Sequence, residues 1–304
     1  MVTLPRVSIL CFGEAIVDLV CEREASSPTD VDGFVPRFGG ALANVAVAAR
    51  RAGAATALAG GAGEDPWGRW LQEQMAAEAI DLRWFSLVAG VRTPIALITF
   101  DADREASFSV YGEGIEATVA SVEPNLPEAT ATSEALVFGS NTLVGEPERE
   151  LTLRARELAL ARGIPVLFDP NLRAHRWGHL ERARELSLSI CEGVFCVRAN
   201  REEAEWLTGE RDPAIAATAL AARGARIAVV TRGADGAVAR GECEADEPGV
   251  EVEVVSPLGA GDAFLGTLAA GLARREWDPR ACEPAIAEAV EAAALTCTVW
   301  RAVR

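Results

Sequence analysis

Residues 252–275 read VEVVSPLGAGDAFLGTLAAGLARR, which predicts a strand, a glycine turn and a helix in succession. Gly259 and Gly261 allow backbone N–H groups to converge at the helix start, where the helix dipole favours an anion. Asp262 lies in the same turn, where a carboxylate can accept a proton from a hydroxyl that attacks a bound phosphate. Gly259, Ala260, Gly261 and Asp262 are therefore the candidate catalytic group. The alternative is that Asp262 only stabilises the helix start.

The same glycines also form the first half of a dinucleotide-binding pattern, GxGxxG. Phe264 stands where that pattern requires its third glycine, and the stretch lies far from the first strand of the chain. Both features argue against a dehydrogenase.

Upstream of this stretch, short apolar runs alternate with stretches rich in Ala, Leu, Glu and Arg. This alternation is typical of a parallel sheet covered by helices. We expect an open, mostly parallel, doubly wound α/β sheet with helices on both faces, in a single domain spanning 1–304. The predicted strands are 7–13, 55–61, 135–139, 164–169, 193–197 and 226–231, and the predicted helices are 41–52, 66–79, 147–162 and 201–208.

Two stretches, 14–37 and 92–113, break this rhythm by alternating apolar with polar residues. The second contains DADRE at 101–105, which predicts a hairpin turn between two strands. We expect the two stretches to form a small antiparallel sheet, a β-lid set over the edge of the main sheet. Because an open edge strand invites pairing, a homodimer through the lid is a further expectation.

Composition excludes several classes of function. The formal net charge of −16 opposes binding to nucleic acid or to an anionic membrane. No apolar run approaches the roughly 18 residues of a membrane span. The N-terminal residues lack the order of regions of a signal peptide, so we expect a cytoplasmic protein. The chain contains no Lys, which excludes a Walker-type phosphate loop.

The seven cysteines include no CxxC pair. Most lie in apolar stretches, where a free cysteine behaves as a small buried hydrophobic residue. We therefore expect structural thiols in preference to metal ligands or disulfides.

A second motif is PRFGGALANVAVAARRAGA at 36–54. Gly39 and Gly40 allow a ligand to approach the backbone closely, and Asn44 offers a donor and an acceptor to a polyol. The alternative is a glycine turn followed by a helix cap.

The third motif is LFDPNLRAHRW at 167–177. Open α/β sheets bind ligands at the carboxyl ends of their strands, which is where Asp169 is expected. Asn171 and Arg173 follow in the loop, and the guanidinium of Arg173 suits phosphate or carboxylate. The alternative is a surface loop with an Asp turn.

The fourth motif is VRANREEAEWLTG at 197–209, which places Asn200 and Glu203 at a strand-to-helix junction. Such a pair can bind the water of a magnesium ion, or it can be a helix N-cap with its capping-box partner.

The four motifs, in their order along the chain, resemble those of the ribokinase-like (PfkB) carbohydrate kinases. The resemblance covers nearly the whole chain. CFGEAIVDLV at 11–20 is similar to the family's first strand, whose aspartate, here Asp18, binds sugar hydroxyls. AVVTRGADGA at 228–237 resembles the nucleotide loop, NREE resembles the NxxE motif, and GAGD resembles the anion hole and base. The resemblance implies substrate contacts for Asp18, Gly39, Gly40, Asn44 and Arg173, and cofactor contacts for Asn171, Asn200, Glu203, Thr231, Gly233 and Gly236.

The resemblance implies an ATP-dependent sugar kinase that uses Mg²⁺, with Glu203 acting on the metal indirectly, through water. GEDPWG at 63–68 and FDPNLRAHRW at 168–177 are most similar to bacterial fructokinases, so the expected substrate is fructose or a related ketohexose. The alternatives are a 2-keto-3-deoxygluconate kinase or another sugar or nucleoside kinase of this type. Acid-sugar kinases commonly carry Arg soon after a lid tyrosine, whereas here Tyr111 precedes Gly112.

Several positions depart from the family pattern. Ser256 and Pro257 replace an Asp-Thr pair that helps to build a potassium site, Val290 replaces a frequent Asn, and the sequence ends at Arg304. We therefore expect little dependence on potassium. An alternative of another class is a catalytically weak pseudokinase that acts as a sugar sensor or scaffold.

Overall fold

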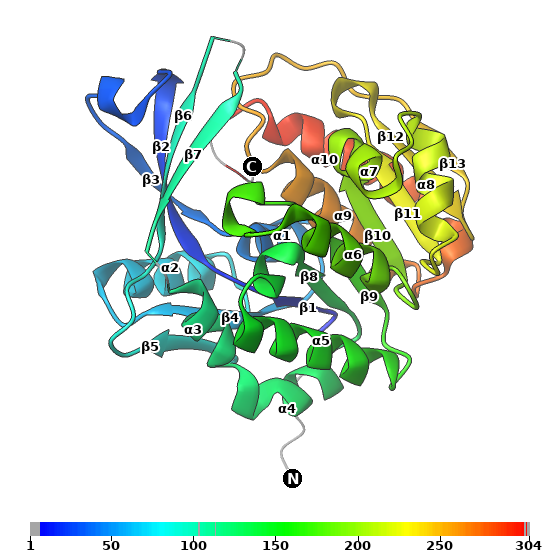
Figure 1. Ribbon diagram of the computed structural model, residues 1–304, viewed down its shortest axis with the longest axis horizontal. Helices are drawn as coiled ribbons and strands as arrows, with labels where there is room; N and C mark the ends of the chain where they lie inside the picture. The colour runs from blue at the N-terminus through cyan, green and yellow to red at the C-terminus, as the bar shows by residue number, and fades with distance from the viewer. Residues whose placement is uncertain (1–6, 103, 113, 301, 303–304) are drawn as a thin grey trace.

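The computed structural model describes residues 7–102, 104–112, 114–300 and 302, and within these the chain forms a nine-stranded and a four-stranded sheet (Figure 1). The larger sheet has the order β13-β12-β11-β10-β9-β8-β1-β4-β5. Its strands from β11 to β5 pair in parallel, and β12 and β13 are antiparallel. The bounds are β1 Ile9–Phe12, β4 Thr56–Gly63, β5 Phe85–Val88, β8 Leu136–Gly139, β9 Val166–Asp169, β10 Cys196–Asn200, β11 Ile227–Thr231, β12 Ala237–Gly241 and β13 Ala245–Glu247.

Helices cover both faces of the larger sheet, because its parallel strands are apolar on both sides. One face is covered by α1 Ala41–Arg51, α2 Pro66–Ala77, α9 Ala260–Arg274 and α10 Cys282–Thr296. The other is covered by α3 Ile115–Ala120, α4 Leu126–Ala131, α5 Glu146–Leu160, α6 Leu180–Ile190, α7 Arg201–Thr208 and α8 Pro213–Ala221. The prediction of a mostly parallel, doubly wound sheet is confirmed.

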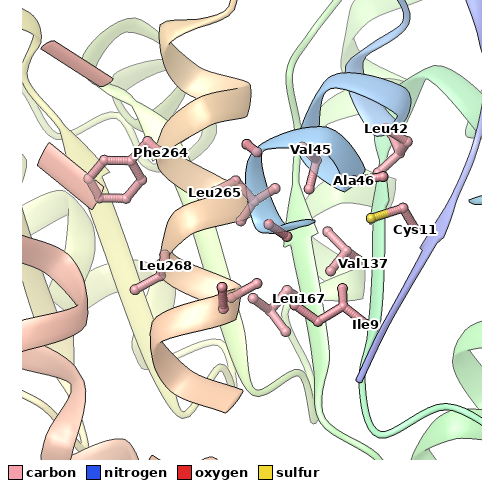
Figure 2. Close-up of a cluster of buried hydrophobic side chains, with 14 of the residues drawn as sticks. Ile9, Cys11, Leu42, Val45, Ala46, Val137, Leu167, Phe264, Leu265 and Leu268 are labelled. Atoms are coloured by element: carbon pink, nitrogen blue, oxygen red, sulfur yellow. The ribbon is translucent and has the colours of Figure 1, made fainter. Parts of the chain in front are cut away.

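The core beside the site lies between the sheet and the helix pair α1 and α9. Figure 2 shows Val45 and Ala46 of α1 and Leu265 and Leu268 of α9 gathered over strand side chains such as Val137. This packing fixes the N-termini of both helices relative to the strand ends.

The predicted strands and helices occur close to their expected bounds, with one exception. Residues 252–255 form no strand, so the prediction at the start of the glycine-turn stretch is wrong there. The N–H groups of Val255 and Ser256 instead donate to the carbonyl of Cys297, at 2.8 and 3.1 Å. A segment whose N–H groups bind the end of a helix cannot use them in a sheet ladder.

The smaller sheet contains β2 Ile16–Glu24, β3 Val35–Gly39, β6 Ile95–Phe100 and β7 Ala106–Tyr111, in the order β3-β2-β6-β7 (Figure 1). We call it the lid sheet. It comes from the two predicted stretches, and β6 and β7 form the predicted hairpin, although residue 103 in its turn lies outside the described residues. The expectation of a purely antiparallel sheet is wrong, because β2 and β6 pair in parallel.

The expectation that all cysteines are free thiols is also wrong. Cys243 and Cys282 form a disulfide, with a Cα–Cα distance of 6.2 Å that lies within the range such bonds require. The bond ties the turn after β12 to the first residue of α10, positions that the sequence separates by 39 residues.

None of the helices in the described part of the chain is both long and apolar enough to cross a membrane.

Candidate active site

The site lies at the carboxyl ends of the parallel strands, where the strand order reverses at β1. A cavity of about 300 Å³ lies there, and residues from the lid sheet form part of its wall. A second cavity of about 630 Å³ lies beside it, towards β11 and α10. Arg198, Asn200, Pro257 and Gly261 line both cavities, so a ligand in one meets a ligand in the other at these residues.

Asp262 lies in the first turn of α9 and faces the smaller cavity. Its side chain accepts a hydrogen bond from the amide of Asn44 at 2.9 Å and a longer one from the amide of Asn171 at 3.4 Å. Two amides therefore orient the carboxylate from opposite halves of the chain. Burial raises the pKa of Asp262 to about 7, although the Asn44 hydrogen bond and the Arg173 guanidinium oppose this rise. Such a carboxyl group is suited to exchange a proton near neutral pH.

Asp18 lies on β2 and faces the same cavity. Burial, with the nearby charge of Asp262, raises the pKa of Asp18 to about 7. Gly39 on the paired strand makes room for this side chain, since a Cβ at Gly39 would lie 2.2 Å from the Asp18 carboxylate. Gly39 therefore leaves the space that the Asp18 side chain occupies.

The loop after β9 connects the carboxylates to the lid sheet. The N–H of Asn171 donates to Asp169 at 3.0 Å, and its side-chain oxygen accepts from Arg173 at 2.6 Å. The Arg173 guanidinium lies 5.7 Å from the ring centre of Phe108 on β7, a cation–π contact between the loop and the lid sheet. Asn171 was predicted beside the cofactor, but it lines the smaller cavity and holds Asp262.

Arg198 on β10 is a site residue that the sequence reasoning missed. Its buried guanidinium donates to Asp169 at 2.9 Å and to the hydroxyl of Thr231 at 2.6 Å. It also lies against the glycine turn, because a Cβ at Gly261 would lie 2.9 Å from one of its nitrogens. The sequence feature that could have identified Arg198 is its position as a charged residue within the apolar run VFCVRA, directly before the NxxE motif.

Asn200 and Glu203 form the capping box that was the alternative interpretation of their motif. The Glu203 N–H donates to the Asn200 side chain at 2.8 Å, and the Asn200 N–H donates to the Glu203 carboxylate at 3.0 Å. The other Glu203 oxygen accepts from the N–H of Leu172 at 2.7 Å. Both oxygens of Glu203 thus accept hydrogen bonds from backbone N–H groups.

The structure brings most of the predicted residues together around the two cavities. The smaller is lined by Asp18, Gly40, Asn44, Asn171, Arg173, Gly259, Gly261 and Asp262, and also by Glu14, Phe108, Asn141 and Arg176, which were not predicted. The larger is lined by Asn200, Thr231, Gly233, Gly236, Ala260 and Gly261, with Val290 on its apolar wall. Gly39 and Glu203 are not among the lining residues of either.

A buried carboxylate beside a glycine turn, with two adjoining cavities, is an arrangement suited to phosphoryl transfer to an alcohol group. The sequence profile described as pfkB family carbohydrate kinase matches residues 7–302. The chain belongs to this family and is a sugar kinase.

Fructokinase-1 of Oryza sativa subsp. japonica is 34% identical over 267 residues, which cover 86% of this chain and 81% of the relative. Fructokinase-2 of Solanum lycopersicum is 30% identical over 263 residues, 86% of this chain and 80% of the relative. Among solved structures, fructokinase from Vibrio cholerae O395 with fructose, ADP and calcium ion is 26% identical, with a TM-score of 0.83 and coverage of 98% and 94%. Aminoimidazole riboside kinase from Salmonella enterica, with aminoimidazole riboside and an ATP analog, is 26% identical, with a TM-score of 0.80 and coverage of 97% and 95%.

Proposed function

We propose that this sugar kinase transfers the γ-phosphate of ATP to a hydroxyl of fructose or a related ketohexose. The sugar occupies the smaller cavity, where Asp18 and Asn44 hydrogen-bond its hydroxyl groups. ATP occupies the larger cavity, near Thr231 and Gly233. The observation that carries the proposal is that Gly261, beside Asp262, lines both cavities, because in-line transfer needs the two substrates to meet at the base.

Asp262 acts as the base in this proposal. Its carboxylate takes the proton of the attacking hydroxyl, while the N–H groups of the 259–261 turn stabilise charge on the transferring phosphoryl group. The side-chain oxygen of Asn44 is buried and has no hydrogen-bond partner among the described residues, so it is free to accept from a sugar hydroxyl. Mg²⁺ bound to ATP would neutralise phosphate charge and would touch Glu203 only through water.

The lid sheet completes the sugar site. Phe108 and Val110 of β7 line the smaller cavity although they are 41% and 38% exposed, so a bound sugar would cover apolar surface there. Closure of the lid sheet excludes water from the phosphoryl group. The same edge strand carries Tyr111, which is 60% exposed, and offers a surface for a homodimer, which sedimentation at micromolar concentration would test. The cytoplasmic location stays a prediction.

The test is steady-state ADP release with Mg-ATP and a panel of fructose, other ketohexoses, 2-keto-3-deoxygluconate and nucleosides. We expect the highest kcat/KM with fructose or a related ketohexose, and little ATP hydrolysis without sugar. A preference for 2-keto-3-deoxygluconate or a nucleoside would reassign the acceptor. No phosphorylation of any member, despite sugar binding, would favour a sensor or scaffold.

A further inference from the structure

The tip of the β6–β7 hairpin contacts two segments that lie far from it in sequence. Arg104 donates from its guanidinium to the carbonyl of Val255 at 3.2 Å. The same guanidinium lies 5.2 Å from the ring centre of Trp300, a cation–π geometry. Phe100, at the end of β6, also contacts Trp300, since its ring packs edge-on against the indole with centroids 5.2 Å apart.

Residues 255–258 lead directly into the glycine turn and are held from two sides. On one side, Val255 and Ser256 donate to the carbonyl of Cys297 at the end of α10. On the other side, Leu258 packs with Trp300 against the small apolar cluster of the lid sheet, which contains Val20, Ala96, Ile98 and Phe100. The approach to the catalytic turn is therefore shared between the lid sheet and the C-terminal residues.

The C-terminal residues also touch the turn and the nucleotide cavity. Gly259 has φ of 75°, and a Cβ there would lie 1.8 Å from the carbonyl oxygen of Ala302, so the two backbones are in direct contact. Cys297, whose carbonyl holds Val255, lines the larger cavity together with Val290 of α10. A ligand in the larger cavity that displaces Cys297 would therefore displace the 255–258 segment, which the hairpin contacts through Arg104.

The backbone of Arg104 has the conformation of a short hairpin turn. Its φ is 64°, in the left-handed region that side-chain-bearing residues rarely adopt. Hydrogen bonds within the turn support this conformation, from the N–H of Arg104 to the carbonyl of Asp101 at 3.1 Å and from the N–H of Glu105 to the Asp101 carboxylate at 2.9 Å. The turn thus presents the Arg104 guanidinium to Val255 and Trp300.

We propose that Arg104 and Trp300 form a latch through which nucleotide binding and closure of the lid sheet over the sugar favour each other. The inference rests on the proposed assignment of the larger cavity to the nucleotide and the smaller to the sugar. Both residues are positioning residues, because they act through the 255–258 segment. By linkage, a nucleotide that favours the latched state raises the affinity for sugar, and the sugar raises the affinity for nucleotide by the same factor.

The test measures this coupling factor by calorimetry, as the ratio of fructose Kd without and with a saturating non-hydrolysable ATP analogue. We expect a ratio of at least about fivefold in the unmodified protein, within the usual range of allosteric coupling. We expect Arg104→Gln and Trp300→Leu to reduce the ratio below about twofold, and Arg104→Lys to retain part of it, because an ammonium group still donates and still favours the indole ring. The matched control is Arg23→Gln on β2, an exposed arginine whose guanidinium bonds Asp32 and the carbonyls of Glu24 and Asp30.

A second measurement does not depend on the sugar. Hydrogen exchange of the amides of β6 and β7 is followed with and without the ATP analogue alone. We expect the analogue to slow exchange in the unmodified protein and in Arg23→Gln, and not in Arg104→Gln. Equal coupling factors in all variants would overturn the latch. So would amide exchange rates of β6 and β7 that are the same with and without the ATP analogue in the unmodified protein. If the unmodified protein phosphorylates no sugar, the proposed function fails, and the exchange comparison still decides the latch.

Discussion

The side-chain amide of Asn44 donates to the carboxylate of Asp262 across 2.9 Å, although 218 positions separate the two residues in the sequence. The bond joins the first turn of α1 to the first turn of α9, so the sugar-binding motif and the proposed catalytic motif share one contact. It fixes one carboxylate oxygen and leaves the other with only the long 3.4 Å contact to Asn171. In the proposed mechanism, that second oxygen accepts the hydroxyl proton.

The pH dependence of turnover should follow the ionisation of Asp262. Burial raises the pKa of Asp262 to about 7, so the basic form is depleted below neutral pH. We expect kcat/KM to fall at least about tenfold per pH unit well below 7, more steeply if protonation of Asp18, whose pKa is also about 7, weakens sugar binding, and to level off above neutral pH. A pH–rate profile of sugar phosphorylation measures this, and a flat profile between pH 5 and 8 would contradict it.

Much of the fold could be predicted because the apolar runs and helical stretches are local signals. The glycine turn after 252–255 was predicted correctly, but its strand was not, since the carbonyl of Cys297 that binds Val255 and Ser256 comes from the far end of the chain. The parallel pairing of β2 with β6 was missed for the same reason, because period-2 alternation shows which residues face the core and says nothing of strand direction.

Among the site residues, too, those marked by local sequence signals could be predicted, and one that depends on a distant contact could not. Asp262, Asn44 and Thr231 lie at helix starts and strand ends that the sequence marks, so their place could be predicted. Arg198 was missed because its apolar neighbours in the sequence indicate only a buried strand. Only the fold shows that Asp169 lies beside Arg198 and pairs with its charge.

Arg198 should contribute charge stabilisation to the phosphoryl group, since it lines both cavities and lies against Gly261. We expect Arg198→Gln to lower kcat by roughly 10²-fold or more, and Arg198→Lys to recover part of it. Arg198→Gln also leaves Asp169 buried without its ion-pair partner, which costs roughly 3–5 kcal/mol of stability.

A double variant separates these two effects. Asp169→Asn combined with Arg198→Gln replaces the ion pair by two neutral amides, so it should recover most of the lost melting temperature without recovering turnover. Turnover that returns together with stability would assign Arg198 a purely structural role.

The Cys243–Cys282 disulfide should stabilise the segment that contains the glycine turn. It closes a loop of sequence separation 39 that includes Asp262 and all of α9. The cross-link restricts the unfolded chain and is worth about 2–4 kcal/mol, or a melting temperature about 3–6 °C higher for a chain of this length. Thermal unfolding with and without a reductant measures the difference, with the Cys243→Ser, Cys282→Ser double variant as control. Identical melting temperatures for the oxidised protein and this variant would contradict the prediction.

Potassium should have little effect on activity. Ser256 is buried and its hydroxyl accepts the N–H of Leu258 at 3.2 Å, and Pro257 has no side-chain oxygen. These two positions therefore supply no carboxylate for a hard cation, which prefers charged oxygen ligands. We expect less than a twofold change in kcat when potassium replaces a bulky organic cation at fixed ionic strength. A rise of several-fold would show that carbonyl groups alone form a cation site.

The most direct test of the account is turnover of Asp262→Asn with the sugar that the unmodified protein phosphorylates best. The amide keeps the size of the side chain but cannot accept the hydroxyl proton, and a general base typically contributes ~10²–10⁴-fold. Loss of a buried carboxyl with a raised pKa should not lower stability at pH 8. The folded pKa lies above the unfolded value of about 4, so proton binding stabilises the folded state fully below about pH 4, and this contribution is lost as the pH rises to about 7. The account predicts a loss of at least about 10²-fold in kcat with sugar affinity and the melting temperature at pH 8 retained, and a variant that keeps more than about a third of the turnover would contradict it.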